Sequence, residues 1–153
     1  MLYQPGRASY PEDEFPLQAL TGTIIASAYS VFQAFGHGFL ESVYRRALVV
    51  ELRDRGVAVE SEKVYELFHH GVLVGRYRAD TVVDSRVIVE TKTGLIADPG
   101  APVQLLNYLC AARLTLGLVV HFGPRGARIK RVIASDPAER RDGAPVRRRP
   151  GIG

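Results

Sequence analysis

The stretch that most constrains the fold of this chain is a β-branched run that carries two opposite charges. Residues 87–92 read Val-Ile-Val-Glu-Thr-Lys, a composition that favours a buried strand. A buried charge costs on the order of several kcal/mol unless it is paired, hydrogen-bonded or bound to a metal. We therefore expect Glu90 and Lys92 either to form a salt bridge on a half-exposed strand or to belong to a functional site.

A third charge, Asp80, lies near the end of the preceding strand-like run. Side chains alternate between the two faces of a strand, so Glu90 and Lys92 share a face. The length of the intervening turn decides whether Asp80 joins them. A three-residue turn at residues 84–86 would put Asp80 directly opposite Glu90. A two-residue turn would put Asp80 opposite Val89 and send the two carboxylates to opposite faces.

Only the first of these registers builds a site. It would bring the carboxylates of Asp80 and Glu90 together, with about 4.5–5.5 Å between their Cβ atoms. That spacing suits a hard cation such as Mg²⁺, with Mn²⁺ as a substitute, because such ions take carboxylate, water and phosphate oxygens as ligands. Lys92 could then orient a water molecule or stabilise charge on a phosphate.

The hydrophobic periodicity predicts an α/β fold, in which a mixed β-sheet with a central three-strand meander is flanked by helices. Helices are expected over residues 17–35, 39–55 and 103–114. Strands are expected over residues 57–68, 72–83, 87–92, 116–122 and 128–133. A single domain therefore occupies residues 17–133, between a flexible leader (residues 1–16) and a flexible basic tail (residues 134–153).

Composition argues against a membrane-spanning protein and against a protein held together by internal disulfides. With 46% hydrophobic and 24% charged residues, no apolar run long enough to span a membrane and one cysteine, the chain is expected to be cytoplasmic. The net charge of +4 is uneven, because residues 121–153 hold nine basic and three acidic side chains. Such a segment can attract a nucleic-acid backbone, or it can simply be a solvated end.

Two further clusters carry polar groups at helical spacing. Gln104 and Tyr108 are four residues apart and so lie on one face of a predicted helix, either at its surface or toward a site. Glu41 lies near the start of another predicted helix, where its charge is favourable and where it could form an i,i+4 pair with Arg45.

Together these clusters resemble a known family. Gly38, Glu41 and Tyr44 fit the signature of the GxxExxY proteins. Asp80, the Glu90–Lys92 pair, and Gln104 with Tyr108 resemble the successive motifs of the PD-(D/E)xK nuclease superfamily, especially its RecB-like branch. The resemblance covers about residues 20–133. The chain departs from the family pattern at Thr91, Ala101 and His121.

The resemblance implies a restriction-endonuclease-like fold and a divalent metal. Asp80 and Glu90 would be metal ligands, with Glu41 as a further carboxylate. Lys92 would position or activate the attacking water. Gln104 and Tyr108 would line the site, and Gly38 and Tyr44 would support it.

The function expected from these residues is Mg²⁺-dependent hydrolysis of phosphodiester bonds, with DNA favoured over RNA as the substrate. One alternative is a non-catalytic nuclease-like module that binds nucleic acid or a protein. Another is a subunit of a repair or defence complex that acts only with its partner. A protein partner or a homodimer remains open, and no membrane association is expected.

Overall fold

In the computed structural model, which describes residues 17–135, three helices cover a five-stranded sheet. The elements in chain order are α1 (Gln18–Phe35), α2 (Glu41–Asp54), β1 (Val59–His69), β2 (Val72–Val83), β3 (Val87–Thr93), α3 (Ala101–Ala112), β4 (Leu116–Gly123) and β5 (Gly126–Ile133). The predicted leader, and the predicted tail beyond Ala134 and Ser135, lie outside the described residues.

The sheet is mixed, as the sequence predicts, and its strand order follows the chain from β1 to β5. Strands β3 and β4 are parallel and are connected through α3, whereas all other neighbours are antiparallel. The predicted meander is present as β1–β2–β3. It fills one side of the sheet rather than its centre, because the crossover through α3 adds β4 and β5 beyond β3 and leaves β3 as the middle strand.

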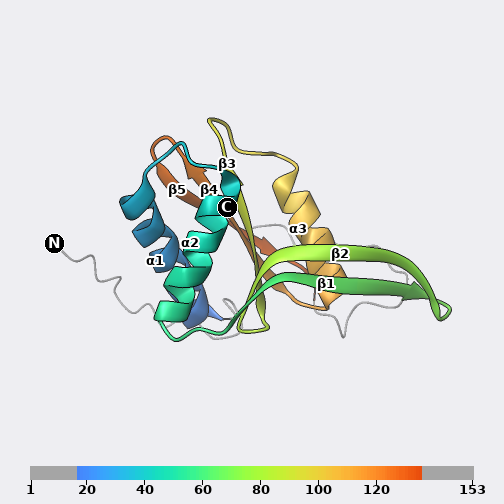
Figure 1. The fold of residues 1–153 in the computed structure, drawn as a ribbon. Helices are drawn as coiled ribbons and strands as arrows, with labels where there is room; N and C mark the ends of the chain where they lie inside the picture. The colour runs from blue at the N-terminus through green and yellow to red at the C-terminus, as the bar shows by residue number, and fades with distance from the viewer. Residues whose placement is uncertain (1–16, 136–153) are drawn as a thin grey trace.

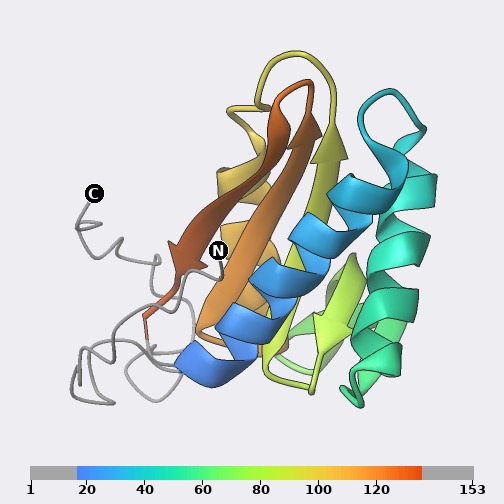
Figure 2. The ribbon, with the colours of Figure 1, turned by 90° about the vertical axis from the view of Figure 1, so that its left-hand side faces the viewer.

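The helices cover opposite faces of the sheet, as Figures 1 and 2 show. Helices α1 and α2 pack on one face, where Leu48 and Val89 belong to a continuous apolar core. Helix α3 packs on the other face, where Leu105 and Val119 belong to a second core. No helix within residues 17–135 is long and apolar enough to cross a membrane.

Helices α2 and α3 each begin two residues away from the predicted start. Helix α2 begins at Glu41 rather than residue 39, because Gly38 has a φ of +115° and Leu40 is extended. Helix α3 begins at Ala101 rather than residue 103, with Pro102 in its first turn. Proline is tolerated there because a backbone N–H in the first turn has no partner within the helix.

A close contact sets α3 against β4. A Cβ atom at Gly117 would lie 2.8 Å from Cδ2 of Leu105, so the glycine permits this approach of helix and strand. The contact fixes the height of α3 above the sheet, and thereby the positions of the polar residues on its exposed side.

Strands β2 and β3 pair over a short length only. The paired residues run from Thr81 opposite Val89 to Val83 opposite Val87. Beyond them, β2 continues with β1 as a two-stranded arm that projects past α3 (Figure 1). The point where β2 leaves β3 lies at Asp80 and Glu90.

Candidate active site

The turn between β2 and β3 places two carboxylates next to each other. Val83 pairs with Val87 across the three-residue turn at 84–86, so the register that would bring Asp80 opposite Glu90 is the one adopted. The strand pairing ends one residue before the two acids, at Thr81 and Val89, and, beyond the effect of burial, the charge of Asp80 still raises the pKa of Glu90. The alternative register, with Asp80 opposite Val89, is therefore excluded.

Glu90 is buried in an environment that disfavours the ionised form of its side chain. Its residue is 4% exposed, and its Oε2 has no hydrogen-bond partner within residues 17–135. Burial first, and then the charge of Asp80, raise the pKa of Glu90 to about 7, against the opposing effect of Lys92. The charge of Glu41 adds to the rise. In its ionised form this carboxylate lacks a donor, so the site favours a proton or a cation.

Lys92 lies beside the carboxylates, on the same face of β3 as Glu90. Its Nζ is 3.8 Å from Oε1 of Glu90 and 3.9 Å from Oδ2 of Asp98. Asp98 was not predicted from the sequence. It comes from the loop before α3, where its Oδ1 accepts a hydrogen bond of 2.8 Å from the backbone N–H of Gly100. This loop thereby joins the lysine to the start of α3.

The signature residues Gly38 and Tyr44 act mainly on the backbone of the loop that precedes α2. Tyr44 is fully buried, and its hydroxyl donates to the carbonyl of Gly36 at 2.6 Å and accepts from the N–H of Phe39 at 3.3 Å. Its ring stacks on Phe122 of β4 with 4.5 Å between centroids. Together with the positive φ of Gly38, these contacts fix the loop before α2, and so the place where Glu41 begins the helix.

Arg45 of α2 also reaches the site, although the sequence suggested a different partner. Its guanidinium lies 4.0 Å from Oδ1 of Asp80, and no ion pair joins it to Glu41 within the described chain. The i,i+4 spacing to Glu41 was the only signal that the sequence offered. The contact with Asp80 depends on how α2 crosses the sheet, which a local pattern does not contain.

Gln104 and Tyr108 form the α3 side of the site. The Nε2 of Gln104 donates to the Tyr108 hydroxyl at 3.0 Å, and the Tyr108 ring packs edge-on against Tyr77 of β2. Burial, followed by the charge of Glu90, raises the pKa of Tyr108. The phenol therefore keeps its proton and can donate a hydrogen bond. Gln104 is exposed and orients Tyr108 rather than touching the carboxylates itself.

The donor set partly fits a divalent cation. Asp80 and Glu90 supply carboxylate oxygens, and the partnerless Oε2 of Glu90 is the kind of atom that a cation would satisfy. No group of three or more His, Cys, Asp or Glu side chains in residues 17–135 is gathered closely enough to hold a metal. Glu41 as a third ligand therefore stays a prediction.

Comparison with known proteins supports the resemblance at the level of the superfamily. The sequence matches the family model of the PD-(D/E)XK nuclease superfamily over residues 18–132, which include every site residue discussed above. No curated protein matches the chain. Among solved structures, the one described as "Crystal structure of SSO0001" is similar at 20% identity over 80% of this chain, with a TM-score of 0.49. The chain spans 58% of the length of that protein.

Replacing Tyr44 by Phe should lower the free energy of unfolding by about 1–3 kcal/mol, because the Gly36 carbonyl and the Phe39 N–H both lose their partner. Urea denaturation would measure the loss. Tyr29→Phe is the matched control, since Tyr29 is 53% exposed on α1 and should change stability little. Equal effects of the two substitutions would contradict the role given to the Tyr44 hydroxyl.

Replacing Glu90 by Gln should stabilise the metal-free protein at pH 8 by about 3 kcal/mol. Because the pKa of Glu90 is raised in the folded state, the wild type loses stability as the pH rises from about 4.5 to about 7, whereas an amide stays neutral. The advantage of the variant should therefore disappear near pH 4.

Thermal or urea unfolding in EDTA at the two pH values would measure this difference. The exposed Glu62, replaced by Gln, is the control and should show no comparable dependence on pH. A Glu90→Gln variant that is less stable than the wild type at pH 8 would refute the unfavourable environment assigned to this carboxylate.

Proposed function

Because the chain belongs to the PD-(D/E)XK nuclease superfamily, we propose that it is a metal-dependent nuclease that hydrolyses phosphodiester bonds by attack of water. The observation that carries this proposal is the buried Glu90 carboxylate, which lies next to Asp80 with one oxygen lacking a partner. Mg²⁺ is the proposed cofactor, and Mn²⁺ should replace it. DNA is proposed ahead of RNA because of the resemblance to the RecB-like branch.

Asp80 and Glu90 would hold the cation, and Glu41 would contribute as a further carboxylate from the start of α2. When bound, the cation would lower the pKa of water and offset the negative charge that develops on the phosphate. The pair of acids is held by strand register and burial, so its geometry exists before substrate arrives.

Lys92 would position the attacking water or stabilise charge on the phosphate, since its ammonium lies within 4 Å of Glu90. Tyr108 would donate a hydrogen bond on the α3 side of the site, with Gln104 orienting its hydroxyl. Arg45 would compensate the charge of Asp80 until the cation is present. Each of these groups projects from a helix or strand rather than from a mobile loop.

The narrower assignment to the GxxExxY proteins is also a proposal. It is supported by the local roles of the three signature residues: Gly38 supplies a positive φ, Glu41 begins α2, and Tyr44 holds the loop between them. Cytoplasmic location, a homodimer and a protein partner are proposals as well. The basic residues of 121–153 would contribute to nucleic-acid attraction.

Asp80→Asn should weaken Mn²⁺ binding at least tenfold, because a charged ligand next to Glu90 is lost while the shape of the side chain is kept. Isothermal titration of the apo protein would measure the affinity. Asp84→Asn is the control, since Asp84 lies in the adjacent turn and pairs with Arg86. Unchanged Mn²⁺ affinity in Asp80→Asn would remove Asp80 from the metal site.

Lys92→Met should abolish Mg²⁺-dependent cleavage of DNA while leaving Mn²⁺ binding measurable, because it removes the ammonium but no metal ligand. Cleavage of single-stranded, duplex and nicked DNA, each with and without EDTA, would test this. Lys63→Met, on the projecting arm, is the control and should retain activity. Wild-type protein that cleaves no substrate with any divalent metal would favour the non-catalytic module.

A further inference from the structure

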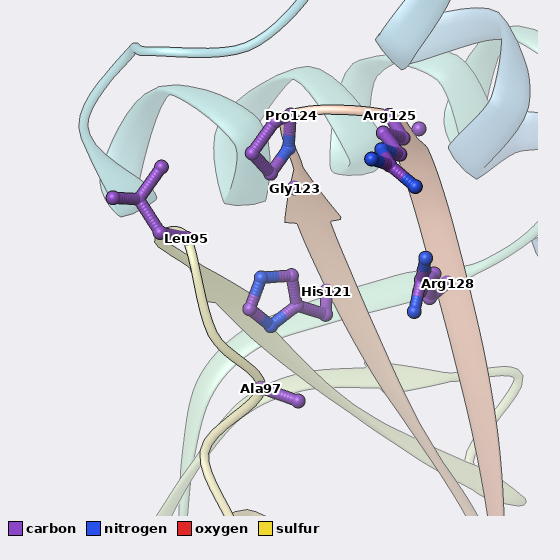
Figure 3. Close-up of a pocket in the computed structure, with 8 residues that line it drawn as sticks. Leu95, Ala97, His121, Gly123, Pro124, Arg125 and Arg128 are labelled. Carbon is purple, nitrogen blue, oxygen red and sulfur yellow. The ribbon is translucent and has the colours of Figure 1, made fainter.

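A basic cavity lies beside the candidate active site, at the end of the sheet where β3 and β4 finish. Its volume is about 440 Å³, and its walls come from the loop after β3, the end of β4 and the β4–β5 hairpin. Figure 3 shows the ring of His121 between the loop that carries Leu95 and Ala97 and the strand that carries Arg128. Arg125 belongs to the turn of the hairpin.

The strand register connects this cavity with the active site. His121 is the β4 partner of Lys92 and the β5 partner of Arg128, so the three residues form one row across the sheet. Because neighbouring strands lie about 4.8 Å apart, the backbone of Arg128 is about 10 Å from that of Lys92. The loop between them contacts both sides: Asp98 approaches Lys92, and Nε2 of His121 donates to the Gly94 carbonyl at 2.8 Å.

The charge of the cavity is positive and uncompensated. Arg125 and Arg128 are exposed and form no ion pair with any carboxylate of residues 17–135. No acidic side chain of that region lines the cavity. His121 is 7% exposed, and its Nδ1 has no hydrogen-bond partner within the described chain. An anionic ligand would satisfy both arginines.

The hairpin holds the two arginines in place. Gly123 pairs with Gly126 across a two-residue turn, which fixes the backbone of Arg125, and Arg128 follows on the adjoining strand. Guanidinium groups offer paired donors that match the oxygens of a phosphate. The cavity therefore has the charge and the donors of a phosphate site.

We propose that this cavity binds a backbone phosphate of the nucleic acid, on the strand that enters the active site and next to the phosphate that is cleaved. The choice of nucleic acid as the ligand rests on the proposed function, whereas the affinity for phosphate rests on the cavity alone. The cavity would hold the substrate in register with Lys92, so its arginines are positioning residues.

The test measures DNA binding by the full chain in EDTA, with a fluorescent oligonucleotide over a series of salt concentrations. Arg125→Gln/Arg128→Gln is compared with Arg113→Gln, which removes a charge from the opposite end of the sheet, at the end of α3. The double variant should bind about tenfold more weakly, and its slope of log affinity against log salt should fall by about one. The control should bind like the wild type.

A second measurement distinguishes phosphate binding in the cavity from hydrolysis at the active site. Bis(p-nitrophenyl) phosphate is a diester too small to occupy the active site and the cavity at once. The double variant should therefore hydrolyse it at the same rate as the wild type. The oligonucleotide should show a raised KM with kcat retained. If no substrate is hydrolysed but the double variant still loses DNA affinity, the result supports phosphate binding in the cavity and contradicts the proposed nuclease function.

Three results would overturn the cavity assignment. The first is wild-type protein that does not bind DNA in EDTA at low salt. The second is a loss of affinity in the double variant no larger than that in Arg113→Gln. The third is a loss seen only with oligonucleotides that carry a 5′-phosphate, which would indicate a terminal phosphate rather than one within the backbone.

Discussion

The burial of the Glu90 carboxylate next to Asp80 is the constraint on which the candidate site depends. The buried Glu90 is brought next to the partly exposed Asp80, and Lys92 and Arg45 compensate their charge incompletely. Such an arrangement opposes folding unless a proton or a cation is taken up. A protein that retained it only for stability would do better with a neutral pair, which is why this feature supports a binding role.

Helices α2 and α3 place different side chains near Asp80 and Glu90. Helix α2 is anchored by the buried Tyr44, so its first residue, Glu41, and its fifth, Arg45, approach the acids with opposite charges. Helix α3 is set by its close approach at Gly117 and presents Tyr108 from the other side. The acids thus lie between two helices that pack on opposite faces of the sheet, at the place where β2 separates from β3.

The sequence predicted the strands of the site well, because their β-branched residues have a clear period. It left the register open, since a turn of two or three residues fits the same letters around Asp84, and one residue moves Asp80 to the other face. It also missed Asp98 as a partner of Lys92 and Arg45 as a partner of Asp80. Both contacts join segments distant in sequence, and local patterns carry no information about them.

The residues of the candidate site come from two separate parts of the chain. Asp80, Glu90, Lys92, Tyr108 and the cavity arginines all fall within residues 80–128, whereas Glu41 and Arg45 arrive on a helix that precedes the sheet. Substitutions in that helix can therefore alter the field at the carboxylates while the strands that carry them stay intact. In the proposed metal-dependent nuclease, metal preference and reaction rate can thus diverge among descendants of one scaffold without any rebuilding of its sheet.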